Sequence, residues 1–243
     1  MTIERRWGDG VSLDFLKYGD IFVPDREEQN RIIAELIPPS TNITHVVDIC
    51  CGEGRLAREI LQRHPNVVLH GYDGSAVMLE KAKQLLDAFM QRFEPQLFDL
   101  ASMEWRTFSY KVHAFVSSLA IHHLDDGGKK CLFQSLAAAL VPGGSVVIAD
   151  LVQPASAAGR RLAAKDWDEI VRKRSMQLRG TLNAFERFQT LNWNYYADPS
   201  PDPMDMPSLL TDQLHWLACA GFKEIDIHWM KAGHVILSAS VPG

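Results

Sequence analysis

The stretch Val46-Val47-Asp48-Ile49-Cys50-Cys51-Gly52-Glu53-Gly54-Arg55-Leu56 decides the fold of this chain. An apolar run rich in β-branched residues ends in a short turn that contains glycine, and a segment compatible with a helix follows. Glycine at a strand-to-helix turn lets the backbone approach a bound ligand closely, because no Cβ stands in the way. The stretch therefore predicts the first strand, turn and helix of an α/β domain that binds a cofactor.

A second feature lies 19 residues beyond Gly54, where Asp73 follows the apolar run Val67–Tyr72. A carboxylate at the tip of the second strand is positioned to accept hydrogen bonds from the two hydroxyls of a ribose. Together, these features predict a nucleoside-containing cofactor on a doubly wound sheet. Because Gly52-x-Gly54-x-x-Ala57 also fits the alanine-ended dinucleotide fingerprint, an NAD-dependent oxidoreductase is a rival interpretation.

Strand and helix signals alternate along the chain, which predicts a parallel sheet with helices on both faces. Strands are expected at 45–49, 67–72, 96–98, 114–118 and 145–151, and helices at 54–63, 75–90 and 128–140. Residues 1–23 are expected to be irregular, and a helix is expected to begin at Pro24. Two helical pieces are expected within 154–207, and Pro207-Ser208 is expected to cap a last helix before a strand pair at 223–229 and 234–239.

Four segments, in order, resemble the motifs of class I S-adenosylmethionine-dependent methyltransferases. They are Asp48–Gly54, Tyr72–Leu79, Phe98–Leu100 and Leu140–Ile148. The resemblance covers roughly residues 44–240 and implies a Rossmann-like, doubly wound, seven-stranded sheet, mostly parallel with an antiparallel last strand. One position departs from the family's Asp/Glu-x-Gly-x-Gly-x-Gly pattern, because Cys50 stands where the first glycine would be. Cysteine is small, so we interpret this as a variation and not as a loss of binding.

The resemblance also implies S-adenosyl-L-methionine as the cofactor, with S-adenosyl-L-homocysteine as the product. Asp48 is expected to order the glycine turn and the ammonium group of the cofactor. Asp73 is expected to bind the ribose hydroxyls and Asp99 the adenine amino group. The full set of expected cofactor-binding residues is Asp48, Cys50, Gly52, Gly54, Asp73, Gly74, Met78, Asp99, Leu100 and Ser117.

Methyl transfer from a sulfonium is an in-line displacement, in which the enzyme mainly supplies position and, where the acceptor needs it, a base. The candidate base lies just past the fourth strand, in Ser118–Leu124. Imidazole titrates near neutral pH, so His122 is the predicted catalytic residue, whereas His123 is expected to be structural. An amine, thiol or activated carbon acceptor would need no dedicated base.

Two variable segments are expected to select the acceptor within a single methyltransferase domain over residues 1–243. Residues 1–40 contain a segment that resembles a lid of bacterial small-molecule methyltransferases, and residues 154–207 are expected to be a helical substrate-binding insertion. Aromatic side chains in a polar loop commonly line pockets, although ordinary packing of the insertion is an open alternative. The expected substrate-binding residues are Tyr18, Phe22, Arg26, Trp193 and Tyr196.

Composition agrees with a small-molecule methyl acceptor. The 243 residues carry a net charge of −5 and 47% apolar residues, without the basic excess that would attract nucleic acid or an anionic membrane. No apolar run reaches the ~20 residues that a bilayer requires. We expect a cytoplasmic protein that is a monomer or a homodimer. No bound metal is expected, because no zinc-like cysteine spacing or carboxylate cluster is evident.

Two other function classes stay open. Basic residues within 160–179 leave an RNA or protein methyltransferase as an alternative. An NAD-dependent oxidoreductase of the short-chain type is less expected, because that type needs a Tyr-x-x-x-Lys pair and no tyrosine of this chain has a lysine four residues later.

Overall fold

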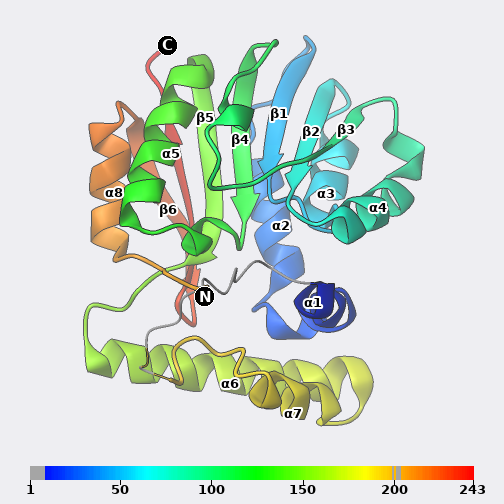
Figure 1. Ribbon diagram of the computed structural model, residues 1–243, viewed down its shortest axis with the longest axis vertical. Helices are drawn as coiled ribbons and strands as arrows, with labels where there is room; N and C mark the ends of the chain where they lie inside the picture. Colours follow the sequence, from blue (N-terminus) through cyan, green and yellow to red (C-terminus); the bar gives the residue numbers. More distant parts are fainter. Residues whose placement is uncertain (1–8, 199, 201–203) are drawn as a thin grey trace, which may run out of the picture.

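The computed structural model describes residues 9–198, 200 and 204–243. Its centre is a seven-stranded sheet with the strand order β3-β2-β1-β4-β5-β7-β6 (Figure 1). The strands are β1 (Thr44–Ile49), β2 (Val67–Asp73), β3 (Phe93–Leu97), β4 (Val112–Ser118), β5 (Leu140–Leu151), β6 (Lys223–Lys231) and β7 (His234–Ser240). The pairs from β3 to β5 are parallel, whereas β7 runs antiparallel to both β5 and β6. The predicted Rossmann-like, mostly parallel sheet is confirmed.

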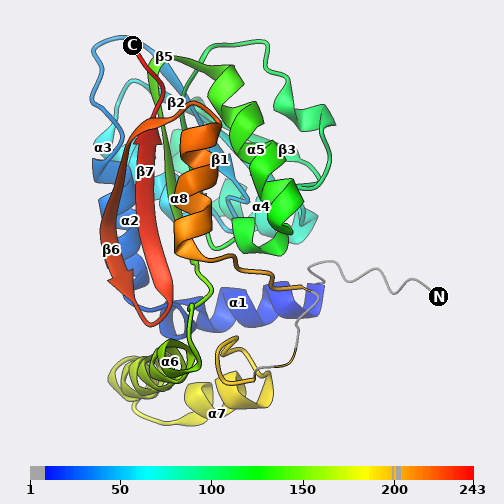
Figure 2. The ribbon, with the colours of Figure 1, turned by 90° about the vertical axis from the view of Figure 1, so that its left-hand side faces the viewer.

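Helices cover both faces of the sheet, and each face has its own hydrophobic core. On one face, α5 (Asp126–Ala139) and α8 (Leu210–Cys219) lie side by side (Figure 2) and bury Phe133 and Leu217. On the other face, α2 (Arg26–Glu35), α3 (Arg55–Arg63) and α4 (Ala76–Leu85) contribute the buried core around Ile33 and Ile60. Strands covered on both faces explain the nearly continuous apolar runs in the sequence.

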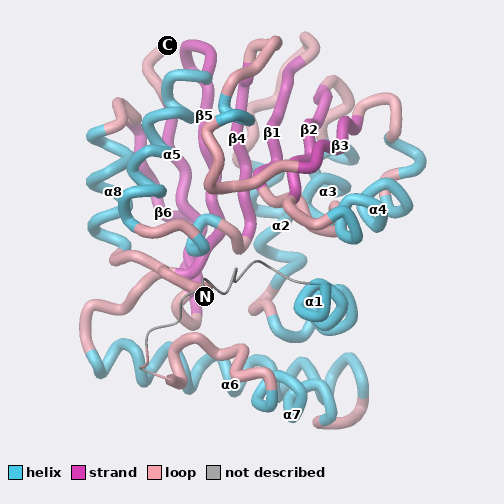
Figure 3. Tube along the Cα trace, viewed as in Figure 1, coloured by secondary structure: helices cyan, strands magenta, loops and turns pink. Residues whose placement is uncertain are grey.

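A third group of helices lies beyond the carboxyl ends of the parallel strands (Figures 1 and 3). It consists of α1 (Asp9–Phe22), α6 (Ala157–Arg179) and α7 (Asn183–Thr190), and we call it the helical layer. The layer has a separate apolar core that includes Phe22, Trp167 and Phe188. Ligands of open α/β sheets bind outside the carboxyl ends of the strands, so the layer covers the edge at which a ligand is expected.

The N-terminal expectation was wrong. Asp9–Phe22 is a helix and not an irregular segment, while residues 1–8 lie outside the described part of the chain. Ile21 and Phe22 are almost fully buried in the core of the helical layer. Packing against helices that lie more than 130 positions later in the sequence stabilises α1, and such long-range contacts leave no local signal.

Other expected boundaries also differ from the structure. The third strand begins at Phe93 rather than at residue 96, and it tolerates Pro95 because it is the edge strand. The expected cap of the last helix is also absent. Leu209 is the N-cap of α8 and makes no side-chain capping bond. The Ser208 hydroxyl instead accepts from the Lys129 ammonium at 2.8 Å and donates to the Asp126 carboxylate at 2.6 Å.

No helix in the described ranges is both long and apolar enough to cross a bilayer.

Tyr196 anchors the loop after α7 to the sheet. Its buried hydroxyl shares its single proton between the Val152 carbonyl oxygen at 3.0 Å and the Gly233 carbonyl oxygen at 2.7 Å. We expect Tyr196→Phe to lower the free energy of unfolding by about 1–3 kcal/mol, because it leaves buried carbonyl groups without their donor. Chemical denaturation measures this change. Tyr195→Phe is the matched control, because that hydroxyl donates to the Gln153 side chain in a less buried position. Equal effects of the two substitutions would contradict the anchoring role.

Candidate active site

A cavity of about 300 Å³ lies at the carboxyl ends of β1, β2, β3 and β4, and we call it the first cavity. Seven of the ten expected cofactor-binding residues line it: Cys50, Gly52, Asp73, Gly74, Met78, Asp99 and Leu100. Asp48, Gly54 and Ser117 do not line it. Three of the four segments that resemble the family motifs therefore line one cavity, although they are dispersed along the chain, whereas Leu140–Ile148 does not line it.

Asp73 joins the two turns that form the floor of the first cavity. One carboxylate oxygen accepts from the Gly52 amide at 2.8 Å, and the other accepts from the Ser75 amide at 2.8 Å. Burial raises the pKa of Asp73, and the two backbone hydrogen bonds oppose that rise. The carboxylate thus fixes the turn after β1 against the turn after β2, and it still borders the cavity where a ribose is expected.

Asp48 is buried directly beside this turn. Neither of its carboxylate oxygens has a hydrogen-bond partner among the described residues. Burial, together with the nearby charge of Asp73, raises the pKa of Asp48 to about 8. A buried carboxyl group without a partner is costly unless a ligand supplies one. The ammonium group of S-adenosylmethionine is a suitable partner, so the residues present fit this cofactor.

The glycine turn itself requires left-handed backbone conformations. Cys50 has a φ of 60°, Gly52 of 56° and Gly54 of 84°. Glycine adopts such angles without strain, which explains why the family pattern has a glycine at the position of Cys50. A Cβ at Gly54 would lie 3.1 Å from the Ala82 Cβ, so Gly54 permits the close packing of α3 on α4 and does not face the cavity. Burial raises the pKa of the Cys50 thiol, which therefore stays protonated.

Two further cofactor positions differ from the simple expectation. The Asp99 carboxylate lines the cavity, but it also accepts from the Ala101 amide at 2.9 Å, as a turn residue does. The buried Ser117 hydroxyl donates to the Ile49 carbonyl oxygen at 2.9 Å and so bridges β4 to β1. Its neighbour Ser118 lines the cavity instead. Successive side chains of an extended strand point to opposite faces, so Ser117 and Ser118 have different surroundings.

A second cavity of about 190 Å³ lies against the helical layer. It shares Phe15, Leu119 and Met204 with the first cavity, so the two adjoin. Of the expected substrate-binding residues, Trp193 lines it. Sequence reasoning missed Phe15, whose ring stacks against Trp193 with centroids 6.2 Å apart. Phe15 lies within residues 1–40, which contain the segment that resembles a lid, but Tyr18 and Phe22 of that region were predicted instead.

The other four expected substrate-binding residues, Tyr18, Phe22, Arg26 and Tyr196, line neither cavity. Phe22 is fully buried and packs against Trp193, with ring centroids 5.1 Å apart, and Tyr18 stacks on Phe22. Tyr196 is the anchor described above. These side chains support the wall of the second cavity from behind.

Arg26 holds the start of α2 against the glycine turn. Its guanidinium donates to the Glu53 carboxylate at 3.0 Å and lies over the Phe15 ring, 4.6 Å from the centroid. Burial lowers the pKa of Arg26, which nevertheless remains a cation next to Glu53. Arg55 extends the network, because it pairs with Glu53 at 2.6 Å and with Asp20 at 2.5 Å. The network thus positions Phe15 over both cavities.

His122 is fixed by Asp150 at the end of β5. Asp150 accepts from the His122 backbone amide at 2.8 Å and from the Nδ1 side of its ring. The Nε2 atom then lies 3.4 Å from the Asp205 carboxylate, and His122 and Asp205 both line the second cavity. Burial lowers the pKa of His122, but Asp150 and Asp205 outweigh it and raise the pKa to about 10. This shift favours the protonated ring, which must lose a proton before it can act as a base.

His123, which was expected to be structural, lines the first cavity. Its Nδ1 atom is 3.2 Å from the Asp205 carboxylate and 3.0 Å from the Met204 carbonyl oxygen. Sequence reasoning missed both carboxylates around the histidines. An acid at the end of the fifth strand was a usable signal for Asp150, whereas Asp205 lies more than 80 positions beyond His122 in a proline-rich loop.

Lys129 explains how the loop that carries Asp205 reaches the site. Its buried ammonium donates to the Leu124 carbonyl, to the Met206 carbonyl and to the Ser208 hydroxyl. The backbone amide of Met206 also donates to the His122 carbonyl oxygen at 2.8 Å. These bonds hold residues 204–208 against α5 and beside the two histidines.

The raised pKa of Asp48 gives a testable pH dependence. Between the unfolded-state pKa near 3.8 and the folded-state value of about 8, the folded protein holds a proton that the unfolded chain has lost. The free energy of unfolding therefore falls as the pH rises through this window. We expect Asp48→Asn to reduce this loss and to be more thermostable than wild type at about pH 8.

The measurement is the melting temperature without ligand at about pH 5 and about pH 8. The exposed Asp87→Asn is the control and should follow wild type. An Asp48→Asn protein with the wild-type pH dependence would show that Asp48 does not carry the buried proton.

Comparison with known proteins agrees with this geometry. Residues 46–144 match the family model described as a methyltransferase domain. Trans-aconitate 2-methyltransferase of Paracidovorax citrulli (strain AAC00-1) is 31% identical over 137 residues, which cover 50% of this chain and 45% of the relative. Ribosomal RNA large subunit methyltransferase G of Aliivibrio salmonicida (strain LFI1238) is 29% identical over 80 residues, which cover 32% of this chain and 21% of the relative. The chain thus matches less than half the length of these curated relatives.

Solved structures share the fold over nearly the whole chain at low identity. A putative O-methyltransferase from Nostoc punctiforme superposes with a TM-score of 0.66 at 17% identity, covering 99% of this chain and 63% of that one. Human N-acetylserotonin methyltransferase, in complex with SAM, gives a TM-score of 0.55 at 15% identity, covering 100% and 61%. Residues 46–144 thus match a methyltransferase domain, and the sheet order and the motif segments are consistent with a class I S-adenosylmethionine-dependent methyltransferase.

Proposed function

We propose that the protein transfers a methyl group from S-adenosylmethionine in the first cavity to a small-molecule acceptor in the second. The observation that carries this proposal is that the two cavities adjoin at Phe15, Leu119 and Met204. An in-line displacement requires donor and acceptor to meet at close range in a fixed orientation, which two adjoining cavities provide.

Three carboxylates would hold the cofactor. Asp73 would accept from the ribose hydroxyls and Asp99 from the adenine amino group, because both border the first cavity. Asp48 would pair with the ammonium group, which ends its isolation as a buried group without a partner. The bound cofactor supplies an activated methyl group on its sulfonium, and the residues of this chain supply its position.

The dimensions of the second cavity favour a compact acceptor. At about 190 Å³, it has Trp167 and Trp193 in its wall, and its polar lining residues include Asp14, His122 and Asp205. Aromatic walls with a few polar groups suit a small ring or short chain that carries a polar function. We propose residues 1–40 as the lid and residues 154–207 as the acceptor-binding insertion of one domain, because their helices cover this cavity.

An RNA or protein acceptor finds less support. Three of the five arginines of α6 are engaged within the protein. Arg160 donates to the Tyr195 carbonyl at 2.6 Å, Arg174 to the Asp20 carbonyl at 2.6 Å and Arg179 to the Lys17 carbonyl at 3.2 Å. Guanidinium groups that hold the helical layer together are less available for a phosphate backbone.

His122 remains our proposed catalytic residue. It lines the second cavity, and Asp150 fixes its ring so that Nε2 lies on the side of Asp205. In the metal-free protein this atom would contact the nucleophilic atom of the acceptor. Orientation of a reacting imidazole by a buried carboxylate is a recurring arrangement in enzymes.

Calorimetric titration tests the cofactor assignment. We expect wild type to bind S-adenosylmethionine and S-adenosylhomocysteine with micromolar affinity and not to bind NAD(H). We expect Asp73→Ala to weaken both about 10-fold or more, since charge-assisted hydrogen bonds to the ribose contribute about 1.5–3 kcal/mol. The melting temperature of the variant controls for the loss of its bonds to Gly52 and Ser75. Binding of NAD(H) alone would contradict the proposal.

Substitution of Trp193 tests where the acceptor binds. Once a screen of small hydroxylated and carboxylated compounds with radiolabelled cofactor has found an acceptor, we expect Trp193→Ala to raise its KM about 10-fold, while the cofactor affinity stays constant. Trp216→Ala is the matched control, because Trp216 on α8 lines neither cavity. A Trp193→Ala protein with unchanged KM would place the acceptor elsewhere.

A further inference from the structure

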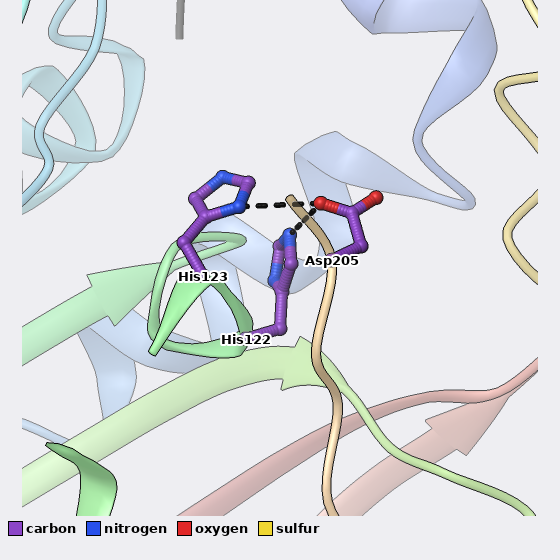
Figure 4. Close-up of side chains that lie close together, drawn as sticks. All are labelled: His122, His123 and Asp205. Carbon is purple, nitrogen blue, oxygen red and sulfur yellow. Dashed lines mark ion pairs between the residues drawn. The ribbon is translucent and has the colours of Figure 1, made fainter. Parts of the chain in front are cut away.

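Three side chains from two distant parts of the chain meet where the cavities adjoin. They are His122, His123 and Asp205 (Figure 4). The possible ligand atoms of these residues all lie within 4.8 Å of one another. His123 borders the first cavity, whereas His122 and Asp205 border the second. The cluster therefore lies at the boundary that a transferred methyl group would cross.

We propose that His122 Nε2, His123 Nδ1 and the Asp205 carboxylate bind one divalent transition-metal ion of the Zn²⁺ type. Two imidazoles and one carboxylate form a donor set that such ions prefer, whereas Mg²⁺ and Ca²⁺ prefer oxygen ligands alone. Three protein ligands leave at least one position of the ion open for a small molecule.

The distances in the cluster suit a common central ion. Zn²⁺ ligands lie about 2.0–2.2 Å from the metal, so two ligands of a tetrahedral ion are about 3.3–3.6 Å apart. The Asp205 oxygen lies 3.4 Å from His122 Nε2 and 3.2 Å from His123 Nδ1. The two imidazole nitrogens lie within 4.8 Å of each other, and they would move closer together as they bind the same ion. Without the ion, the Asp205 oxygen forms ion pairs with both imidazoles, and bonds to the ion would replace them.

The surroundings of His122 form an independent argument. A histidine that binds a metal commonly donates its other ring N–H to a carboxylate, which fixes the tautomer and the ring orientation. Asp150 is buried and contacts His122 Nδ1, which leaves Nε2 as the ligand atom. With Asp205 in the site and Asp150 behind it, two carboxylates balance the two charges of the ion.

The loop that supplies the third ligand is held in place before any ion binds. Lys129 bonds to Met206 and Ser208, on the loop that carries Asp205, and the Met206 amide bonds to the His122 carbonyl. A preorganised ligand set binds an ion without the cost of ordering a loop. The sequence did not predict this site, because two histidines and one acid from a distant loop do not form a local metal motif.

The site also narrows the acceptor class, an inference that rests on the proposed function. The open position of the ion would face the second cavity, since His122 and Asp205 both line it. The matching acceptor is a small molecule that coordinates through an oxygen, such as a hydroxyl or carboxylate. A coordinated hydroxyl loses its proton at lower pH than a free one, as metal-bound water does.

The test uses the full chain without an affinity tag, treated with a chelator and then titrated with Zn²⁺ by calorimetry or with Co²⁺ by visible absorption. We expect one ion per chain, the intense visible bands of four-coordinate Co²⁺, and a rise in melting temperature with Zn²⁺. We expect His123→Ala and Asp205→Asn each to weaken Zn²⁺ binding about 100-fold or more, and Asp150→Asn about 10–100-fold. His228→Ala, an exposed histidine, and Asp14→Asn, a carboxylate of the second cavity outside the cluster, should bind as wild type does.

Absence of Zn²⁺ binding to wild type, or binding that is equally strong in His123→Ala and Asp205→Asn, would overturn the proposal. Each variant is used only if its melting temperature without metal shows a folded protein, and the two variants remove different ligands. Metal binding is measured without S-adenosylmethionine, and cofactor binding is measured separately. Failure of the metal site is therefore distinguishable from failure of the proposed methyl transfer.

Discussion

The Asp73 carboxylate, which accepts one hydrogen bond from each of two backbone turns, is the interaction on which the site depends. Parallel strands bring their carboxyl ends to one edge of the sheet, but the loops that follow are free to diverge. By accepting from Gly52 and from Ser75, Asp73 holds the loops after β1 and β2 in one fixed arrangement. The first cavity forms over these loops, and the orphaned Asp48 lies beneath them.

The helical layer completes the site through ionic and aromatic contacts. Glu53 belongs to the same turn as Gly52 and binds Arg26, which in turn supports the ring of Phe15. Phe15 borders both cavities, so the turn under the cofactor is connected through two side chains to the boundary between cofactor and acceptor. The acceptor cavity is thus built from elements that the sheet itself does not supply.

Sequence patterns predicted the sheet and most of the first cavity, because both arise from local signals. The apolar run into Gly52 and the carboxylate Asp73 lie in segments whose spacing follows from the geometry of a strand, turn and helix. Ser118 lines the first cavity and the expected Ser117 does not, since periodicity alone does not fix which residue at the end of a strand faces the cavity. The second cavity was predicted poorly, because α1 is helical through packing on α6 and α7. Asp205 lies beside the histidines because Lys129 bonds to Met206 and Ser208 on the same loop, and no local pattern encodes these contacts.

The central claim is that donor and acceptor meet where the two cavities adjoin. A crystal structure of the protein with S-adenosylhomocysteine tests this claim most directly. The account predicts that the adenosyl group fills the first cavity, that the ammonium group contacts Asp48, and that the sulfur atom faces Leu119 and the second cavity. A cofactor product bound with its sulfur turned away from that boundary, or with its adenosyl group in the second cavity, would contradict the account.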